Sequence, residues 1–135
     1  MKKIKAAIIG CGVISEVYLD SIRENFQILD IVACSDLDEV RMNSTAQKYG
    51  IRAAAYEEIL KEPEIEMVIN LTSPAAHYPL TKQALEHGKH VYSEKMIAVE
   101  LEQAKELCQI AEKNKVRLGC APDTFLGGGI QTAKY

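Results

Sequence analysis

The chain has 135 residues, of which 47% are hydrophobic and 26% are charged, a composition typical of a globular domain with its own core. A formal net charge of −3, with no basic cluster larger than Lys2-Lys3, argues against a nucleic-acid partner held through phosphate contacts. No apolar stretch approaches the ~20 residues of a membrane span, and the four cysteines contain no C-x-x-C pair, so neither a zinc site nor a disulfide framework is indicated.

Apolar, strand-like runs alternate with helical patterns along the chain. The expected strands cover residues 5–9, 28–34, 52–55, 67–71, 90–93 and 116–121, and the expected helices cover 13–25, 38–49, 56–61, 75–87 and 99–114. Asp38 is a candidate helix cap, and Gly50 and Gly88 are helix stops. The alternation predicts the α/β class, a Rossmann-type doubly wound parallel sheet of order 3-2-1-4-5-6 with helices on both faces. Its ligand crevice lies over the carboxyl ends of the strands.

The first strand runs into two glycines, Gly10 and Gly12, just before a helical pattern opens. Gly10 suits a sharp strand-to-helix turn, and Gly12 suits close approach of a diphosphate to the backbone. The helix N-terminus then presents unpaired N–H groups to that anion. Ser15 stands at the third glycine position of the fingerprint, where a small residue can serve helix–strand packing. An ordinary strand-to-helix turn is the alternative explanation of the pair alone.

Asp36 ends the second expected strand, 24 positions after Gly12. A carboxylate there can accept hydrogen bonds from the adenosine ribose and disfavours a 2′-phosphate, so NAD is favoured and NADP stays possible. Arg41 follows one helical turn later and could stack on adenine or reach a phosphate, or be a solvated helix residue.

Two further loops fall at carboxyl ends of strands. In the first, Thr72, Ser73 and Pro74 suit contacts to the cofactor, while Thr72 or Ser73 also suits a helix cap. His77, in the first turn of that helix, is either an exposed residue or a ligand contact. In the second, Glu94 and Lys95 can orient the nicotinamide ribose and polarise a substrate oxygen. A surface ion pair without function is the alternative for these two residues.

The cysteines and the N-terminus bear on the compartment. Cys34 and Cys120 fall inside expected strands and suit buried packing, whereas Cys11, beside a helix N-terminus, could have a lowered thiol pKa. The lysines before the first apolar run imitate a secretion signal, but two glycines interrupt that run and Glu16 follows it. We therefore expect a cytoplasmic protein.

Four segments together resemble the glucose–fructose oxidoreductase, inositol dehydrogenase and MocA (Gfo/Idh/MocA) family of NAD(P)-dependent oxidoreductases. They are G-C-G-V-I-S, S-D, N-L-T-S-P-A-A-H and A-L-E-H-G-K-H-V-Y-S-E-K. The resemblance covers nearly all of residues 4–95. The later G-C-A-P-D-T-F-L-G-G-G-I-Q-T-A stretch, residues 119–133, is similar to a sugar-dehydrogenase-like branch, in which it crosses from the cofactor domain into the active site.

The resemblance implies hydride transfer between a nicotinamide cofactor and a sugar- or polyol-like substrate, and possible homo-oligomers. Lys95 would be catalytic and would also contact the nicotinamide ribose. The other implied cofactor contacts are Gly10, Cys11, Gly12, Val13, Ile14, Asp36, Arg41, Thr72, Ser73, Pro74, His77 and Glu94. No metal is implied. Asp123, in a turn after the last strand, either faces the substrate or is a solvated carboxylate.

The sequence departs from this family in two respects. Met96 stands where the family usually has a proline after the Glu-Lys pair, and we expect a trans Lys95–Met96 bond because a non-proline cis bond costs about 2.5–4 kcal/mol. Family members also run to two domains. We therefore expect residues 1–122 to form the NAD(P)-binding domain and 123–135 to begin the connection to a substrate domain. We further expect this chain to bind NAD weakly without turnover. A non-catalytic nucleotide-sensing or interaction module and, with less support, a methyltransferase using S-adenosylmethionine are the alternatives.

Overall fold

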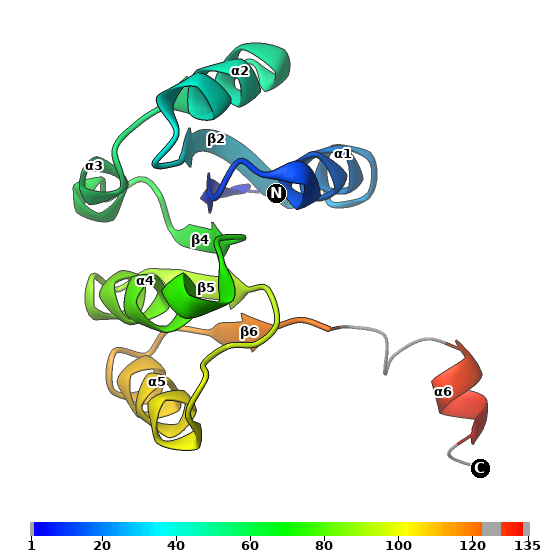
Figure 1. The fold of residues 1–135 in the computed structure, drawn as a ribbon, viewed down its shortest axis with the longest axis vertical. Helices are drawn as coiled ribbons and strands as arrows, with labels where there is room; N and C mark the ends of the chain where they lie inside the picture. The colour runs from blue at the N-terminus through cyan, green and yellow to red at the C-terminus, as the bar shows by residue number, and fades with distance from the viewer. Residues whose placement is uncertain (1, 123–127, 134–135) are drawn as a thin grey trace.

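Six parallel strands form one sheet in the computed structural model, which describes residues 2–122 and 128–133 (Figure 1). The strand order is β3-β2-β1-β4-β5-β6, as predicted. The strands are β1 (Ile4–Ile9), β2 (Leu29–Ser35), β3 (Arg52–Ala53), β4 (Met67–Asn70), β5 (His90–Ser93) and β6 (Leu118–Cys120). The helices are α1 (Val13–Asn25), α2 (Glu39–Tyr49), α3 (Tyr56–Lys61), α4 (Pro74–Glu86), α5 (Leu101–Lys113) and α6 (Gly128–Ala133).

Helices cover both faces of the sheet, which confirms the doubly wound arrangement. Figure 1 shows α1 on one side of the strands and α4 and α5 on the other. The central strand β1 is apolar from Ala6 to its end because neither of its faces meets water there, and Ala6, Ala7 and Ile8 are fully buried. Successive β1 residues point to opposite faces. Ala7 and Ile9 accordingly join the cluster that includes Leu85 of α4 and Leu107 of α5, whereas Ile8 packs with Leu19 and Ile22 of α1.

Element boundaries follow local capping. Asp38 caps α2 by accepting hydrogen bonds from the amides of Val40 (3.0 Å) and Arg41 (3.1 Å), and Gly50 ends that helix with a φ of 64°, so both predicted signals are confirmed. Helix α5 begins at Leu101 and not at the expected residue 99, because Glu100 forms a capping box with Gln103. Strand β6 is shorter than expected because the Val116 amide still bonds to the Ala111 carbonyl at the end of α5 (3.0 Å).

None of the helices in the described residues combines the length and hydrophobicity needed to cross a bilayer. No group of three or more histidine, cysteine, aspartate or glutamate side chains in that part of the chain is placed to hold a metal ion.

Candidate cofactor-binding site

The carboxyl ends of four strands bring the predicted site residues to one edge of the sheet. Ile9, at the end of β1, is level with Ser35 of β2 and Asn70 of β4, and Asn70 is level with Ser93 of β5. The next residues along each strand therefore meet at this edge: the glycine turn, Asp36, the Thr72 loop and the Glu94–Lys95 turn. We call this arrangement the carboxyl-edge site.

The glycine turn connects β1 to α1 through a backbone conformation that requires glycine at Gly10. Gly10 has a φ of +96°, and a Cβ there would lie 2.7 Å from both the carbonyl carbon and the carbonyl oxygen of Leu71. A Cβ built on Gly12 would meet no protein atom within 4 Å. Gly12 is the N-cap of α1 and offers no side-chain hydrogen bond, so the first-turn amides have no side-chain cap there. Open space over uncapped amides is the geometry that suits an anion.

Ser15 fills the third position of the glycine fingerprint. Its side chain is fully buried, and its hydroxyl donates to the Gly12 carbonyl oxygen at 2.6 Å. The prediction that a small residue serves packing at this position is confirmed.

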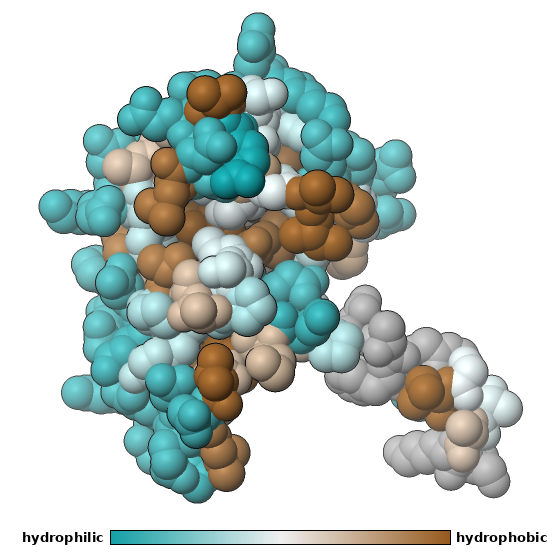
Figure 2. Space-filling model, in the orientation of Figure 1, coloured by the Kyte–Doolittle hydropathy of each residue, from teal (hydrophilic) through white to brown (hydrophobic). Residues whose placement is uncertain are grey.

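The start of α1 presents apolar side chains to solvent on the side of the molecule where Figure 2 shows a hydrophobic patch. Val13 is 92% exposed, and Val17 and Ile14 are also exposed. Of the predicted contacts in this segment, Val13 and Ile14 are thus accessible to a ligand, through their side chains as well as through the helix N-terminus.

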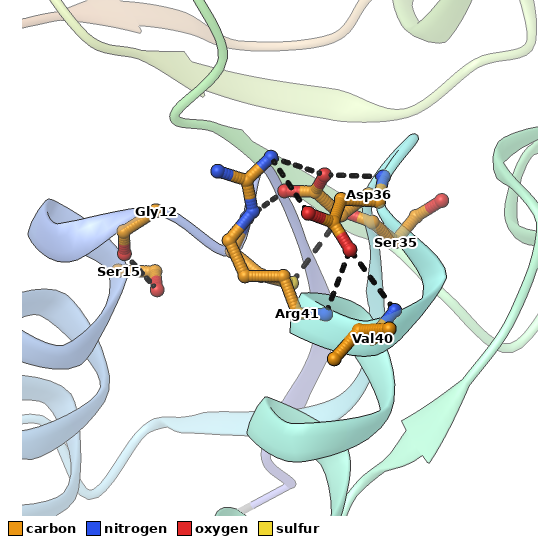
Figure 3. A network of polar contacts seen from close by, with 8 residues as sticks. Gly12, Ser15, Ser35, Asp36, Val40 and Arg41 are labelled. Atoms are coloured by element: carbon orange, nitrogen blue, oxygen red, sulfur yellow. Dashed lines mark hydrogen bonds and ion pairs between the residues drawn. The ribbon is translucent and has the colours of Figure 1, made fainter.

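Asp36 is the most heavily hydrogen-bonded carboxylate of the site (Figure 3). Its Oδ2 accepts from the Cys11 amide at 2.7 Å, and its Oδ1 accepts from the Asp38 amide at 2.8 Å and from Arg41 Nη2 at 3.1 Å. Burial alone would raise the pKa of Asp36, but these hydrogen bonds and the Arg41 charge outweigh it and hold the pKa below its ordinary value. The side chain is only 9% exposed. Asp36 is therefore a fixed, ionised acceptor.

Arg41 leans from α2 over Asp36, as Figure 3 shows. Its guanidinium also lies 3.9 Å from an Asp38 carboxylate oxygen, and its side chain remains 54% exposed. The sequence left two roles open for Arg41, a contact to the ligand or a solvated helix residue. The structure places it beside Asp36, with room to turn outward.

The backbone amide of Cys11 points to Asp36 and so is already occupied. The pKa of the Cys11 thiol is lowered, the direction expected from the sequence, chiefly by a hydrogen bond with the buried Cys34 thiol. The same contact, together with burial, raises the pKa of Cys34. Cys11 is itself buried, whereas Cys120 in β6 is half-buried.

The loop after β4 is organised by Asn70. Its Oδ1 accepts from the Thr72 hydroxyl at 2.7 Å and from the Thr72 amide at 3.2 Å. Ser73, and not Thr72, occupies the N-cap position of α4, but its side chain makes no capping hydrogen bond, and Pro74 is the first helical residue. The expected side-chain cap is therefore wrong, because the Asn70 side chain and the fixed φ of Pro74 already define the turn. Ser73 and Pro74 are exposed.

His77 is buried, so the alternative of an exposed residue is wrong. Its ring is 1% exposed, with Nδ1 at 2.7 Å from the Met96 carbonyl oxygen and Nε2 at 2.8 Å from the Thr72 carbonyl oxygen. The ring thus connects two loops of the carboxyl-edge site.

The Glu94–Lys95 turn is held from α1 as well as from its own backbone. The Tyr18 hydroxyl donates to Glu94 Oε1 at 2.8 Å, and the Lys95 amide donates to Glu94 Oε2 at 3.0 Å. Burial and the bond to Glu94 raise the pKa of Tyr18. Glu94 and Lys95 form no ion pair with each other, and the exposed Lys95 ammonium has no partner among the residues that the structure describes. The surface ion-pair alternative is therefore wrong.

The Lys95–Met96 peptide bond is cis, so the expectation of a trans bond was wrong. That expectation considered only the intrinsic preference of a non-proline dipeptide. In the folded chain the Met96 carbonyl oxygen is engaged by the buried His77 ring, a tertiary contact that the local preference does not include.

A cavity of about 520 Å³ opens beside this turn, on the face of the sheet that carries α1. Glu94, Lys95 and Pro122 lie at one part of its lining, and apolar and aromatic side chains of α1 and the strands supply the rest, including Tyr18, Phe26, Ile69 and Tyr92. Asp123, the remaining candidate, lies outside the described residues.

Sequence reasoning did not single out Asn70 or Tyr18 as part of the site. A polar residue inside the apolar run M-V-I-N-L was the available signal for Asn70, because a buried amide must find partners. Tyr18 carries no such signal, since its partner Glu94 is 76 positions away.

Comparison with protein families matches residues 4–121 to the GFO_IDH_MocA family, described as an oxidoreductase family with an NAD-binding Rossmann fold. An uncharacterized oxidoreductase of Schizosaccharomyces pombe is 31% identical over 99% of this chain and 38% of its own length. Inositol 2-dehydrogenase of Salmonella paratyphi B is 28% identical over 85% of this chain and 35% of its own length. The chain thus spans less than two fifths of the length of these relatives.

Among solved structures, the WlbA dehydrogenase of Chromobacterium violaceum, in complex with NADH and UDP-GlcNAcA, superposes with a TM-score of 0.92. It is 24% identical to this chain, and the match covers 99% of this chain and 39% of that one. At this identity the similarity supports the fold.

Proposed function

The chain belongs to the Gfo/Idh/MocA oxidoreductase family through its NAD-binding Rossmann domain, and on that premise we propose that the carboxyl-edge site binds NAD and presents Lys95 to a sugar- or polyol-like substrate. The observation that carries the proposal is the pairing of an unfilled space over Gly12 with a fixed carboxylate at Asp36. These are the two features that a dinucleotide requires of its first βαβ unit.

The cofactor's pyrophosphate lies at the start of α1 in this proposal. Gly12 leaves room for a close approach, and the amides of Val13 and Ile14 begin a helix that lacks a side-chain cap. The helix dipole adds about half a positive charge at this point, which favours the anion. The Cys11 amide takes no part because it donates to Asp36.

Asp36 selects NAD over NADP in this proposal. Its Oδ1 already accepts two hydrogen bonds and its Oδ2 accepts one, so Oδ2 retains capacity for one more, which a ribose hydroxyl can supply. A 2′-phosphate at the same place would bring a dianion against an ionised carboxylate. Arg41 offsets part of that repulsion, so we expect NADP to bind more weakly and not to be fully excluded.

The nicotinamide half lies between the Thr72 loop and the Glu94–Lys95 turn in this proposal. When bound, the nicotinamide ring accepts or donates the hydride. Thr72, Ser73 and Pro74 line one side of the ring, and Glu94, fixed by Tyr18, lies at the ribose. The exposed Lys95 ammonium, which has no partner among the described residues, polarises the reacting oxygen of the substrate or takes its proton.

Substrate turnover requires more of the protein than this chain. We propose that residues 1–122 form the cofactor domain and that a substrate domain, which supplies the remaining acid or base, belongs to the complete oxidoreductase. The relatives are more than twice as long, which supports this division. Robust dehydrogenase activity of the 135-residue chain would contradict it. Nothing in the described residues or in the relatives favours the sensing module or the methyltransferase.

A calorimetric titration of the chain with NADH, NADPH and S-adenosylmethionine tests the function. We expect saturable heats with NADH, weaker binding of NADPH, and no binding of S-adenosylmethionine. Binding of S-adenosylmethionine without binding of either nicotinamide nucleotide would overturn the proposal.

A further inference from the structure

His77 is the buried residue through which the two loops around the proposed nicotinamide position contact each other. It lies in the first turn of α4, and its two ring nitrogens face the carbonyl oxygens of Met96 (2.7 Å) and Thr72 (2.8 Å). Thr72 belongs to the loop after β4, and Met96 follows Lys95 in the turn after β5. One ring therefore spans both loops.

Both partners of the ring are carbonyl oxygens, which only accept hydrogen bonds. Each contact is a hydrogen bond only when the adjacent ring nitrogen carries a proton, so the doubly protonated ring satisfies both carbonyls at once. The contact to Met96 depends on the proton at Nδ1, and the contact to Thr72 depends on the proton at Nε2. The two contacts can therefore be removed separately.

The helix that carries His77 is itself anchored to the sheet by Asn70, which is fully buried at the end of β4. The Asn70 side-chain amide donates to the His77 backbone carbonyl (3.2 Å) and to the Thr81 hydroxyl (3.1 Å). The backbone carbonyl of Asn70 accepts from the Glu94 amide at 2.9 Å. One strand end thus fixes both the helix and the start of the Glu94–Lys95 turn.

The backbone on each side of Lys95 is consequently held in place. Glu94 is tied to Asn70 before it, Met96 is tied to His77 after it, and the Lys95 amide donates to Glu94 Oε2. The Lys95 side chain is left exposed. A lysine that polarises a substrate oxygen must be placed within hydrogen-bond reach of it, so a fixed backbone has a direct use here.

We propose that His77 is a positioning residue that sets the direction of Lys95 by holding the Met96 carbonyl. This inference rests on the proposed function, since it assumes that Lys95 lies at the nicotinamide half of the cofactor. His77 does not touch the cofactor or the substrate through its ring nitrogens, because both are engaged within the protein.

Asparagine and glutamine substitutions separate the two contacts. The amide nitrogen of asparagine is as many bonds from Cβ as His77 Nδ1, and that of glutamine is as many bonds away as Nε2. His77→Asn therefore keeps a donor for Met96 and loses the bond to Thr72, whereas His77→Gln keeps a donor for Thr72 and frees Met96. A residue that only fills space would give the opposite order of harm, because asparagine leaves the larger cavity.

The test compares NADH with ADP-ribose, which lacks the nicotinamide, by calorimetry on the 135-residue chain and both variants. We expect His77→Gln to weaken NADH binding by about tenfold, the effect of one hydrogen bond, and to change ADP-ribose binding less than about twofold. We expect His77→Asn to bind NADH within about threefold of the parent chain. Greater damage from His77→Asn, or equal losses for both nucleotides, would overturn the proposal.

Nitrogen-15 spectra of the histidine rings in the parent chain keep the test valid where a variant fails to fold. We expect a proton on His77 Nδ1, and an unprotonated Nδ1 would overturn the proposal. The other two histidines are internal references, because His87 Nδ1 lies at the Gln83 carbonyl and His90 Nδ1 accepts from the Arg117 amide. His87→Ala, an exposed residue at the end of the same helix, is the matched control variant.

The proposed function and this proposal fail in distinguishable ways. A parent chain that binds neither NADH nor ADP-ribose contradicts the proposed function, and the ring spectra then still decide whether His77 holds the Met96 carbonyl. A parent chain that binds NADH, with His77→Gln binding it equally well, contradicts the positioning role alone.

Discussion

Gly10→Ala should destabilise the fold through the backbone of the glycine turn. A residue with a Cβ at positive φ costs about 1–2 kcal/mol, and Gly10 has a φ of +96°. The added Cβ would also lie 2.7 Å from the Leu71 carbonyl and 2.9 Å from the Thr72 amide nitrogen, backbone atoms that cannot rotate away. Relieving such overpacking costs about 1–3 kcal/mol more. The total of about 2–5 kcal/mol should lower the Tm by about 10 °C or more.

Thermal and urea unfolding followed by circular dichroism measure this loss, with Gly12→Ala as the matched control. A Cβ on Gly12 meets no protein atom within 4 Å, so we expect its stability to stay within about 0.5 kcal/mol of the parent chain. The same variant should bind NADH at least about tenfold more weakly, because its Cβ enters the space proposed for the pyrophosphate. A Gly10→Ala chain as stable as the parent, or a Gly12→Ala chain that binds NADH equally well, would refute the reasoning.

Three further predictions concern single side chains. Asp36→Asn should narrow the gap between NADH and NADPH affinities in calorimetry. In the parent chain, ionised Asp36 stabilises the fold above the ordinary aspartate pKa, and this stability is lost below about pH 4 as the pH falls through the lowered Asp36 pKa. Asp36→Asn should lack this contribution, and a variant whose acid unfolding transition matches that of the parent would argue against this. Tyr18→Phe removes the hydroxyl that holds Glu94 and should lower the free energy of unfolding, measured with urea, by about 1–2 kcal/mol. An unchanged urea midpoint would count against that bond. Ser15→Leu should lower the free energy of unfolding by about 1–3 kcal/mol, because Ser15 is fully buried and a larger side chain would overpack its site. Ser15→Gly should lower it less.

The fold followed from the sequence because its signals are local. Continuous apolar runs mark strands that are buried on both faces, and Asp38 and Gly50 set the limits of α2. The right-handed crossovers of such a chain leave few other strand orders, and the order 3-2-1-4-5-6 was predicted correctly. The meeting of the glycine turn, Asp36 and the Glu94–Lys95 turn at one edge followed from the same rule.

The contacts within the site could not be predicted, because they join residues distant in sequence. The bond from Tyr18 to Glu94 crosses 76 positions, and the contact from His77 to Met96 depends on how α4 packs against the turn after β5. That contact also accompanies the cis bond at Met96, which the preference of an isolated dipeptide does not indicate. Backbone sterics thus place the loops, while side-chain partners depend on tertiary packing.

A crystal structure of the chain grown with NADH tests the central claim most directly. We predict that the pyrophosphate lies against Gly12 and the first turn of α1, with the adenosine ribose on the Asp36 carboxylate. A nucleotide bound elsewhere, or a glycine turn left empty at saturating NADH, would contradict this account.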